Sequence, residues 1–310
     1  MFLEFALLIM GIFILVKSSK AVVKSSIITA KALGIGELFI GFALLAFATS
    51  LPEFMVNIIS ILDGEPVIGI STLIGSSISD ITLVFAAMGI VASFAISKND
   101  LDEISEILLL ACILGVFVFV LGEISAVFGI FALCLFFLFT RKMAKKNMHI
   151  NGAKSKGIPT LVALTNISKI IIYALIVVAS AYAVTTSAAR IASHYSIMES
   201  FIGAAIIGLG SSLPELSVSV QAIRRKNVDL AIGNAIGSLM VNLGFVLGIT
   251  AVFSPVFVDV GTKTAILFMI AASAVLYAML RSRKFDMKKS LIMILVYIAF
   301  WVTMFIVGVL

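Results

Sequence analysis

Apolar runs that are long enough to cross a lipid bilayer recur along this sequence, and they limit the possible folds more than any other feature. A helix needs about 20 residues to span the hydrocarbon core, because it rises about 1.5 Å per residue. Ten such runs are found, at residues 2–25, 36–62, 66–96, 102–120, 123–140, 168–190, 199–223, 228–254, 263–280 and 289–309. Hydrophobic residues make up 62% of the chain and charged residues only 12%, which excludes an ordinary soluble domain. The sequence therefore predicts an all-α polytopic membrane protein with ten transmembrane helices.

The basic residues predict the orientation of these helices. If the N-terminus lies outside, all but two of the 22 Lys and Arg residues fall on the inner side, and only Arg190 and Lys263 lie outside. Cytoplasmic loops carry this excess in membrane proteins, so we expect both termini outside the cell membrane and the first apolar run retained. The basic segment at residues 141–158 is expected to be a cytoplasmic linker. The positive net charge then needs no nucleic-acid partner, and the bilayer is the expected surrounding, with no obligate protein partner.

An internal duplication divides the chain into two halves. ATSLPEF at residues 48–54 returns as GSSLPEL at 210–216, and STLIGSSISD at 71–80 returns as GNAIGSLMVN at 233–242. Each motif returns 162 residues later, so the two copies align without a gap from the first motif to the second. We therefore expect one five-helix repeat at residues 1–140 and a second at 159–310. An odd number of crossings makes the second repeat enter the membrane from the opposite side, an inverted arrangement that is typical of secondary transporters.

The duplicated motifs place proline and glycine inside membrane helices. Proline removes a backbone hydrogen bond, and transporter helices are often interrupted near the bilayer midplane, where freed carbonyl groups bind ions. We expect breaks at Thr49–Pro52 and Ser211–Pro214 in the second and seventh helices. Further breaks are expected at Gly75–Ser76 and Gly237–Ser238 in the third and eighth helices.

Carboxylates in these interrupted helices need a counter-charge. Glu53, Asp80 and Glu215 lie there with Asn242, and none of the four helix cores contains Lys or Arg. A charged side chain at the bilayer centre costs at least ~2.5 kcal/mol, so the missing charge is expected to be a bound cation or a proton. The surrounding hydroxyl, amide and carbonyl oxygens, without His or Cys, suit hard ions such as Ca²⁺ and Na⁺.

The paired motifs resemble the α-repeats of the cation/calcium antiporter superfamily, most closely those of its prokaryotic sodium/calcium exchangers. The resemblance covers essentially the whole chain. It implies that Glu53 and Glu215 bind Ca²⁺, assisted by Thr49 and Ser211. It also implies Na⁺ ligands in both repeats, at Ala46, Ser50, Ser76 and Asp80, and at Gly208, Ser212, Ser238 and Asn242.

Two departures from the family pattern accompany the resemblance. The family commonly carries the amide in the first repeat and the aspartate in the second, whereas Asp80 and Asn242 are exchanged here. Ser71-Thr72 also replaces the Gly-Asn pair that the second repeat keeps as Gly233-Asn234. The total of two Glu, one Asp and one Asn is unchanged, so the charge of the site is expected to be the same.

The resemblance implies an electrogenic antiporter that exchanges Na⁺ for Ca²⁺ by alternating access. The long first and sixth helices are expected to carry the gates, and no resident cofactor is expected. A proton/calcium antiporter of the same superfamily is the main alternative, since the same carboxylates could exchange protons, and a cation channel is a weaker one. Small residues alone could also join helices, but this does not account for two glutamates. We expect no enzymatic activity, because the core has no HExxH motif, paired-aspartate motif or Ser/His dyad.

Overall fold

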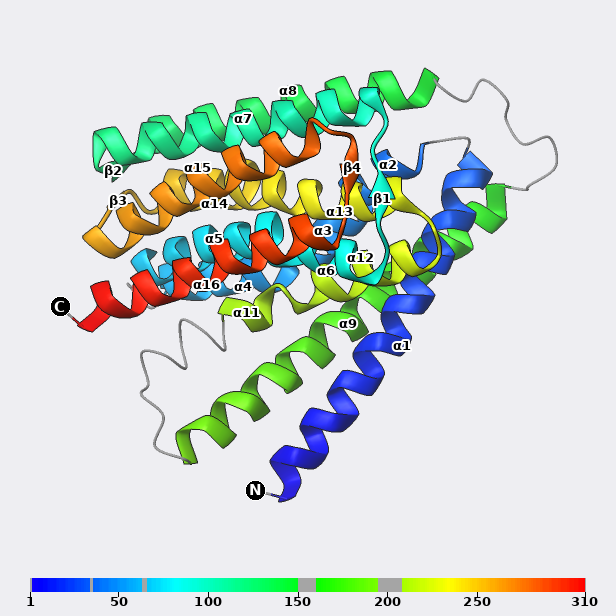
Figure 1. Cartoon of the computed structure of the whole chain (residues 1–310), viewed down its shortest axis with the longest axis horizontal. Helices are drawn as coiled ribbons and strands as arrows, with labels where there is room; N and C mark the ends of the chain where they lie inside the picture. The colour runs from blue at the N-terminus through cyan, green and yellow to red at the C-terminus, as the bar shows by residue number, and fades with distance from the viewer. Residues whose placement is uncertain (1, 34–35, 63–65, 150–159, 195–207, 310) are drawn as a thin grey trace. The chain divides into compact units, whose positions relative to one another are not determined.

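The computed structural model (Figure 1) describes residues 2–33, 36–62, 66–149, 160–194 and 208–309. Packing divides the chain into two compact units, which are described separately. Unit 1 contains Met1–Leu51 and Leu138–Ser238, and unit 2 contains Pro52–Phe137 and Leu239–Leu310. Each unit therefore takes its helices from both repeats, an intermixing that the sequence did not predict.

Unit 1 is built around two long helices, α1 (Phe2–Leu33) and α9 (Thr160–His194), which pack side by side (Figure 1). Helix α1 also packs on α12 (Leu213–Arg224), where the Ser19 and Ser217 hydroxyls lie 2.8 Å apart. The remaining elements of unit 1 are short helical segments and helix ends: α2 (Glu37–Ile40), the π-helix η1 (Gly41–Leu45), α3 (Ala46–Thr49), α11 (Gly208–Ser211), α13 (Val228–Met240) up to Ser238, and the end of α8 (Ala126–His149).

Unit 2 is a helical bundle in which α15 (Val260–Leu280) packs against α5 (Pro66–Ser79), α7 (Lys98–Leu121) and α16 (Met287–Val309). Helix α16 also packs against α6 (Phe85–Val91). The other elements are most of α4 (Leu51–Leu62), the first part of α8, the π-helices η2 (Asp80–Val84) and η4 (Val241–Val246), α14 (Leu247–Phe253), and the strands β1 (Phe94–Ala95), β2 (Glu123–Ile124), β3 (Val256–Phe257) and β4 (Lys284–Phe285).

The secondary structure repeats with the period that the motifs predict. Helices α4 and α12 begin 162 residues apart, and the same separation holds for α5 and α13, for α7 and α15, and for β1 and β3. The two π-helices also correspond, since η2 begins at Asp80 and η4 begins at Val241, one residue before Asn242. The predicted duplication is therefore confirmed at the level of individual helices and strands.

Two short antiparallel ribbons show that the repeats are inverted. Strand β1 pairs with β4 through Phe94 and Phe285, and β2 pairs with β3 through Ile124 and Val256. Helix α7 runs from β1 to β2, whereas its counterpart α15 runs from β3 to β4. The two helices therefore run in opposite directions between the same two ribbons. With 24 residues, α7 separates the ribbons by about 36 Å, a distance sufficient to cross a bilayer.

The described helices fall into ten stretches that match the ten predicted spans: α1, α2 to α4, α5 to α6, α7, α8, α9, α11 to α12, α13 to α14, α15 and α16. By length and hydropathy alone, six of the described helices can cross a membrane, or seven if the bent pair on either side of Ser50 counts as one span. The first part of the predicted seventh span, residues 199–207, lies outside the described residues.

The predicted interruptions are confirmed at the two proline motifs. In the two helices with glycine motifs the irregular turn lies at other residues than predicted. Helices α3 and α11 end at Thr49 and Ser211, and α4 and α12 begin two residues later, as the proline motifs predict. The predicted breaks at Gly75 and Gly237 are wrong, because α5 and α13 continue through both glycines. The departure from α-helical geometry comes later, at η2 and η4, where a π-helical turn widens the helix beside Asp80 and Asn242.

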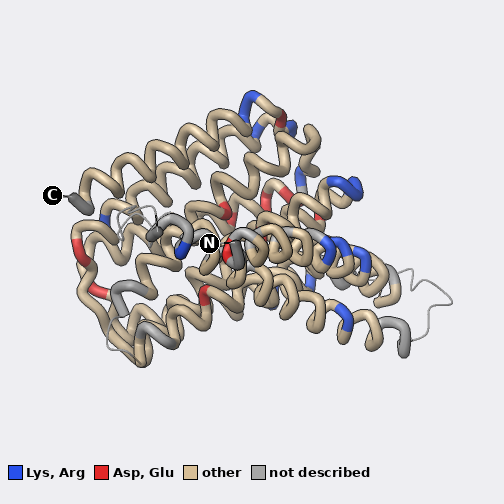
Figure 2. Tube along the Cα trace, turned by 90° about the horizontal axis from the view of Figure 1, so that it is seen from below, with Lys and Arg blue, Asp and Glu red and all other residues tan. Residues whose placement is uncertain are grey.

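Basic residues of unit 2 lie at helix ends (Figure 2). The turn that joins α15 to α16 and contains β4 carries Arg281, Arg283 and Lys284, and Lys98 begins α7 beside β1. The end that carries the β2–β3 ribbon has Lys263 near the start of α15. Residues 141–149 of the expected linker extend α8, and residues 150–158 lie outside the described part of the chain.

Candidate ion-binding site

The two proline motifs begin new half-helices, and this explains how proline is tolerated there. Pro52 and Pro214 are the second residues of α4 and α12, where a backbone N–H has no partner within the helix. Just before each helix the chain turns at Ser50 (φ −83°, ψ 11°) and Ser212 (φ −86°, ψ 1°). Glu53 and Glu215 then occupy the first turn of their helices, where the helix dipole favours a negative charge.

In unit 1, Glu215 is the centre of a group of hydroxyl residues from both repeats. Its side chain is 1% exposed, and its Oε1 atom accepts hydrogen bonds from Ser50 at 3.3 Å and Ser238 at 3.4 Å. The Oε2 atom has no hydrogen-bond partner among the described residues. A buried carboxylate oxygen in this state is disfavoured unless a proton or cation compensates it.

Asn234 joins the same group from α13. Its amide nitrogen donates to the Glu215 carbonyl at 3.3 Å and to Ser219 Oγ at 3.0 Å, and its Oδ1 atom accepts from Thr49 Oγ1 at 3.4 Å. Glycine lets α13 approach this closely: a Cβ on Gly237 would lie 2.7 Å from Ala46 Cβ. Two sequence-distant segments are thereby held against each other beside the glutamate.

In unit 2, Glu53 lies against an amide from its own helix. Glu53 is 1% exposed, and the Asn57 amide nitrogen donates to its carbonyl at 3.0 Å and to the Gly69 carbonyl of α5 at 3.1 Å. The Asn57 Oδ1 atom accepts a hydrogen bond from Thr250 of α14 at 3.3 Å. Asn57 therefore links the helix that carries the glutamate to a helix of each repeat.

Unit 2 also holds the exchanged aspartate and asparagine. Asn242 of η4 donates from its amide nitrogen to Ser76 Oγ of α5 at 3.4 Å, and its Oδ1 atom has no hydrogen-bond partner among the described residues. Asp80 begins η2 four residues after Ser76, about one helical turn further along, and is 2% exposed. Glu53, Ser76, Asp80 and Asn242 are thus all buried residues of one unit.

The other predicted ligands belong to unit 1. Thr49 donates to the Leu45 carbonyl at 3.1 Å as well as facing Asn234, and the Ala46 carbonyl accepts from the Ser50 backbone at 2.9 Å. Gly208 begins α11, and Ser211 and Ser212, which lie at the helix break, are both buried. The structure thus places Thr49, Ser50 and Ser238 directly around the Glu215 group.

Three functional candidates had no role in the sequence prediction. Asn57, Asn234 and Thr250 are buried and hydrogen-bonded beside the glutamates, although only Asn234 belongs to a recognised motif. A buried amide in an apolar helix is costly unless it is hydrogen-bonded, so each asparagine within the duplicated segments was a signal that could have been followed.

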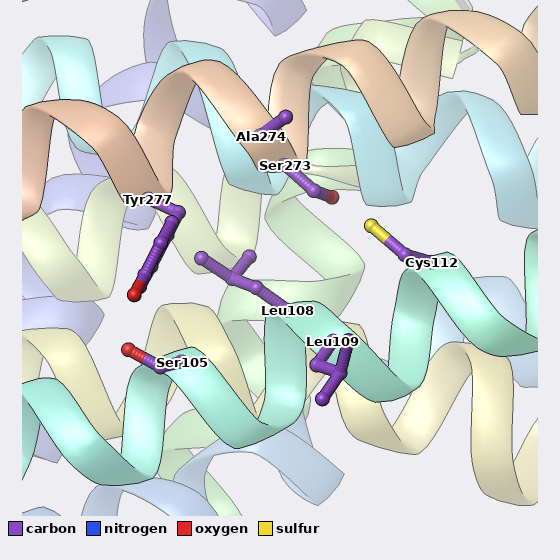
Figure 3. Close-up of a pocket in the computed structure, with 7 residues that line it drawn as sticks. All are labelled: Ser105, Leu108, Leu109, Cys112, Ser273, Ala274 and Tyr277. Atoms are coloured by element: carbon purple, nitrogen blue, oxygen red, sulfur yellow. The ribbon is translucent and has the colours of Figure 1, made fainter.

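A lateral cavity in unit 2 is separate from these residues. It has a volume of about 290 Å³ and lies between α7 and α15, where Leu108 and Cys112 face Ser273 and Tyr277 (Figure 3). Its lining is mainly apolar and contains none of the predicted ligands. A cavity of this composition does not suit a hard cation.

The chemistry of the two polar groups is that of all-oxygen cation ligation. No three His, Cys, Asp or Glu side chains gather in one place within the described parts of the chain. A cation held here would therefore combine carboxylate oxygens with hydroxyl, amide and carbonyl oxygens, a set that suits Ca²⁺ and Na⁺ and serves transition metals poorly.

Known proteins share both the sequence and the fold of this chain. It is 29% identical to the sodium/calcium exchanger MaX1 of Methanosarcina acetivorans, covering 97% of this chain and 98% of that relative. It is also 29% identical to the inner membrane protein YrbG of Escherichia coli, over 84% of this chain and 82% of that relative. Among solved structures, the sodium-calcium exchanger NCX_Mj soaked with 10 mM Na⁺ and no Ca²⁺ superposes with a TM-score of 0.83 at 25% identity, covering 96% of this chain and 97% of that one.

The family model supports the same assignment independently for each repeat. The model of the sodium/calcium exchanger protein family matches residues 3–142 and matches again at residues 167–306. These two matches contain both proline motifs, both glycine motifs and all ten helical stretches, in part or in whole. The chain is therefore a multi-pass membrane protein that belongs to the sodium/calcium exchanger family.

Proposed function

We propose that this protein exchanges Na⁺ for Ca²⁺ across the membrane by alternating access. The observation that carries the proposal is the Glu215 group: a fully buried carboxylate that accepts two hydroxyl hydrogen bonds on one oxygen and has none from the described residues on the other. Such a group needs a cation or a proton as its missing partner. The membership of the exchanger family and the likeness to MaX1 and NCX_Mj support Na⁺ and Ca²⁺ as the ions.

In this proposal Glu53 and Glu215 are Ca²⁺ ligands, assisted by Thr49 and Ser211. Both glutamates are buried in the first turn of a half-helix. The proposed Na⁺ ligands are the other residues that the family resemblance implies, of which alanine and glycine can offer only their backbone carbonyl oxygens: Ala46, Ser50, Ser76, Asp80, Gly208, Ser212, Ser238 and Asn242. Hydroxyl and amide side chains are neutral, so they ligate a small cation without adding charge to be balanced.

Exchange follows from the need to keep the buried carboxylates neutralised. Either ion load compensates their charge, whereas an empty site would carry bare charge through a low-dielectric region. Translocation is therefore favoured only with ions bound, which couples the two fluxes. If the Na⁺ load carries the larger charge, each net charge moved is worth ~2.3 kcal/mol per 100 mV, and transport is electrogenic.

The packing of α1 suits it to a sliding gate. Several of its buried hydroxyls donate to carbonyls of the same helix, as Ser26 does to the Val22 carbonyl at 2.9 Å and Thr29 to the Ser25 carbonyl at 2.9 Å. A movement of α1 together with α9 leaves these bonds intact. The contact between Ser19 and Ser217 on α12 would have to break, which costs about 0.5–1.5 kcal/mol.

The direct test is ⁴⁵Ca²⁺ uptake into proteoliposomes that contain the purified protein. We expect uptake when Na⁺ is loaded inside and diluted outside. If the outgoing Na⁺ load carries more charge than the incoming Ca²⁺, a K⁺ diffusion potential that makes the interior positive should speed this uptake, and one that makes it negative should slow it. Uptake driven by a proton gradient and indifferent to Na⁺ would contradict the proposal and assign the chain to the proton/calcium antiporters. Non-saturable Ca²⁺ leakage without a counter-ion would instead indicate a channel.

The orientation is tested with two cysteines in a background that lacks Cys112 and Cys134. Ser282 lies in the exposed basic turn beside β4, and Glu123 is an exposed residue of the opposite ribbon. Because basic residues stay in the cytoplasm, we expect a membrane-impermeant maleimide to label Glu123→Cys in intact cells and Ser282→Cys only after the cells are broken open. Labelling of both residues from the same side would refute the inverted topology.

A further inference from the structure

The two buried asparagines bond the main chain of the glutamate in their own repeat, but one lies on the helix that carries the glutamate and the other lies on the next helix. In the second repeat Asn234 lies on α13 and reaches the Glu215 carbonyl of α12 and Ser219 beside it. In the first repeat Asn57 lies on α4 itself, bonds the Glu53 carbonyl and reaches the Gly69 carbonyl of α5. Each amide therefore bonds the main chain of the glutamate in its repeat and the neighbouring helix.

The 162-residue register shows that the amide has changed places between the repeats. Asn57 corresponds to Ser219, and Thr72 corresponds to Asn234. The first repeat thus pairs an asparagine on α4 with a hydroxyl residue on α5, whereas the second pairs a serine on α12 with an asparagine on α13. Each pair of helices keeps one amide and one hydroxyl residue at these two positions.

A third position changes in step with this exchange. The Gly69 carbonyl accepts the Asn57 amide, and a Cβ on Gly69 would lie 2.9 Å from Asn57 Oδ1 and 3.1 Å from Asn57 Cα. The corresponding residue of the second repeat is Ala231, whose carbonyl accepts from the smaller Ser219 at 3.4 Å. The larger side chain therefore faces glycine and the smaller one faces alanine, as close packing of the two helices requires.

Each amide also engages a hydroxyl residue that comes from the other repeat. Thr250 of α14 donates to Asn57 Oδ1, and Thr49 of α3 lies within hydrogen-bond distance of Asn234 Oδ1. Thr49 is itself a proposed Ca²⁺ ligand, and it precedes the break at Ser50. The Asn234 amide thus holds the start of α12, at Glu215, against the end of α3, at Thr49.

We propose that Asn57 and Asn234 are positioning residues of the exchanger, and that Asn57 supplies in the first repeat the amide that Thr72 does not provide. By bonding the backbone carbonyls of Glu53 and Glu215, the two amides fix the main chain of each glutamate and so the position of its carboxylate relative to the ion. The inference rests on the proposed function, in which these glutamates are the Ca²⁺ ligands. It assigns to Asn57 the role that Asn234, the counterpart of Thr72, has in the second repeat.

The test in the first repeat compares Asn57→Ser with the double variant Asn57→Ser/Thr72→Asn, which copies the second repeat. Serine has one donor in place of the two amide hydrogens of Asn57, so the single variant cannot bond the Glu53 and Gly69 carbonyls together and keeps at most a bond like the 3.4 Å one from Ser219 to the Ala231 carbonyl. We expect its KM for Ca²⁺ to rise about tenfold, the equivalent of one net hydrogen bond. The double variant should return to within about threefold of the wild-type KM.

The second repeat gives a stricter form of the same test. Asn234→Thr is expected to raise the KM, and adding Ser219→Asn should restore it only together with Ala231→Gly, because the larger side chain needs the space that Gly69 leaves in the first repeat. Recovery in Asn234→Thr/Ser219→Asn without the glycine would contradict the packing argument. Recovery only in the triple variant would support it.

Two controls separate positioning from folding. Ser273→Ala removes a buried hydroxyl of α15 that bonds the Met269 carbonyl and is not among the predicted ligands, and it should leave the KM unchanged. The amount of monodisperse protein and the Ca²⁺-dependent rise in melting temperature are measured for every variant, so the comparison does not depend on Na⁺-driven flux alone. A wild-type KM in Asn57→Ser, or a double variant that regains folded protein but not the KM and the Ca²⁺-dependent stabilisation, would overturn the inference.

Discussion

Replacing Glu215 with glutamine is expected to reduce Na⁺-dependent Ca²⁺ flux at least about a hundredfold, which corresponds to about 2.7 kcal/mol. The substitution preserves the size of the side chain but removes the negative charge that a Ca²⁺ ion would balance. It also turns one of the two oxygen ligands into an amide nitrogen, beside the hydroxyls of Ser50 and Ser238 that now donate to the carboxylate. Glu53→Gln should have a loss of similar size, because Glu53 occupies the corresponding first turn of α4.

The matched control for both substitutions is Glu103→Gln. Glu103 is a carboxylate in the first part of α7 that is 5% exposed and lies outside both polar groups. We expect this variant to retain flux within about threefold of the wild type. All three variants are reconstituted at equal amounts of folded protein, and ⁴⁵Ca²⁺ uptake is measured under an outward Na⁺ gradient. Near wild-type flux in Glu53→Gln or Glu215→Gln would remove that residue from the proposed site.

The second large effect is expected at Asp80 and Asn242, whose charge is exchanged relative to the family pattern. Asp80→Asn removes one buried negative charge, and Asn242→Asp adds one beside Ser76. In the proposed site, either change would leave the ion load and the carboxylates unmatched in a low-dielectric region. We expect each single variant to lose at least about tenfold in Na⁺-driven Ca²⁺ flux, or about 1.4 kcal/mol.

The double variant Asp80→Asn/Asn242→Asp restores the total charge and should recover measurable exchange, with a changed apparent affinity for Na⁺. The recovery is expected because both residues are buried members of unit 2 and each stands in or beside a π-helical turn. Fluxes of the wild type, the two single variants and the double variant form a double-mutant cycle, which isolates the coupling between the positions. If the double variant is no better than the worse single variant, the two positions are not interchangeable, and their assignment as Na⁺ ligands should be withdrawn.

Much of the fold could be predicted because a membrane imposes few solutions on an apolar chain. The ten apolar runs required helices, and the 162-residue register of Pro52 with Pro214 required two related halves. Five crossings in each half then required inversion, which the opposite directions of α7 and α15 confirm. The breaks at Ser50 and Ser212 were also predictable, since proline cannot continue the preceding hydrogen-bond pattern.

The glycine motifs were harder to interpret because glycine has two uses. Gly75 and Gly237 were predicted as breaks, yet both lie within regular helix. At Gly237 the missing side chain serves close packing, with Ala46 and Phe42 where a Cβ would stand. Nothing within one helix distinguishes a glycine that bends the chain from one that admits a neighbour, and the π-helical turns at Asp80 and Val241 have no such local marker either.

By itself the sequence determined the membrane class, the helices, the duplication and the residue types that suit Ca²⁺ and Na⁺. Only the tertiary structure decided which residues meet: Ser50 of the first repeat bonds Glu215 of the second, and Asn57 bonds Thr250 across 193 positions. Such contacts depend on how helices pack and on where the chain crosses between the two units, after Leu51, after Phe137 and after Ser238. Local periodicity reports which face of a helix is apolar but not which partner covers it, so the matching bonds of Asn57 and Asn234 to the glutamate main chains became visible only in the tertiary structure.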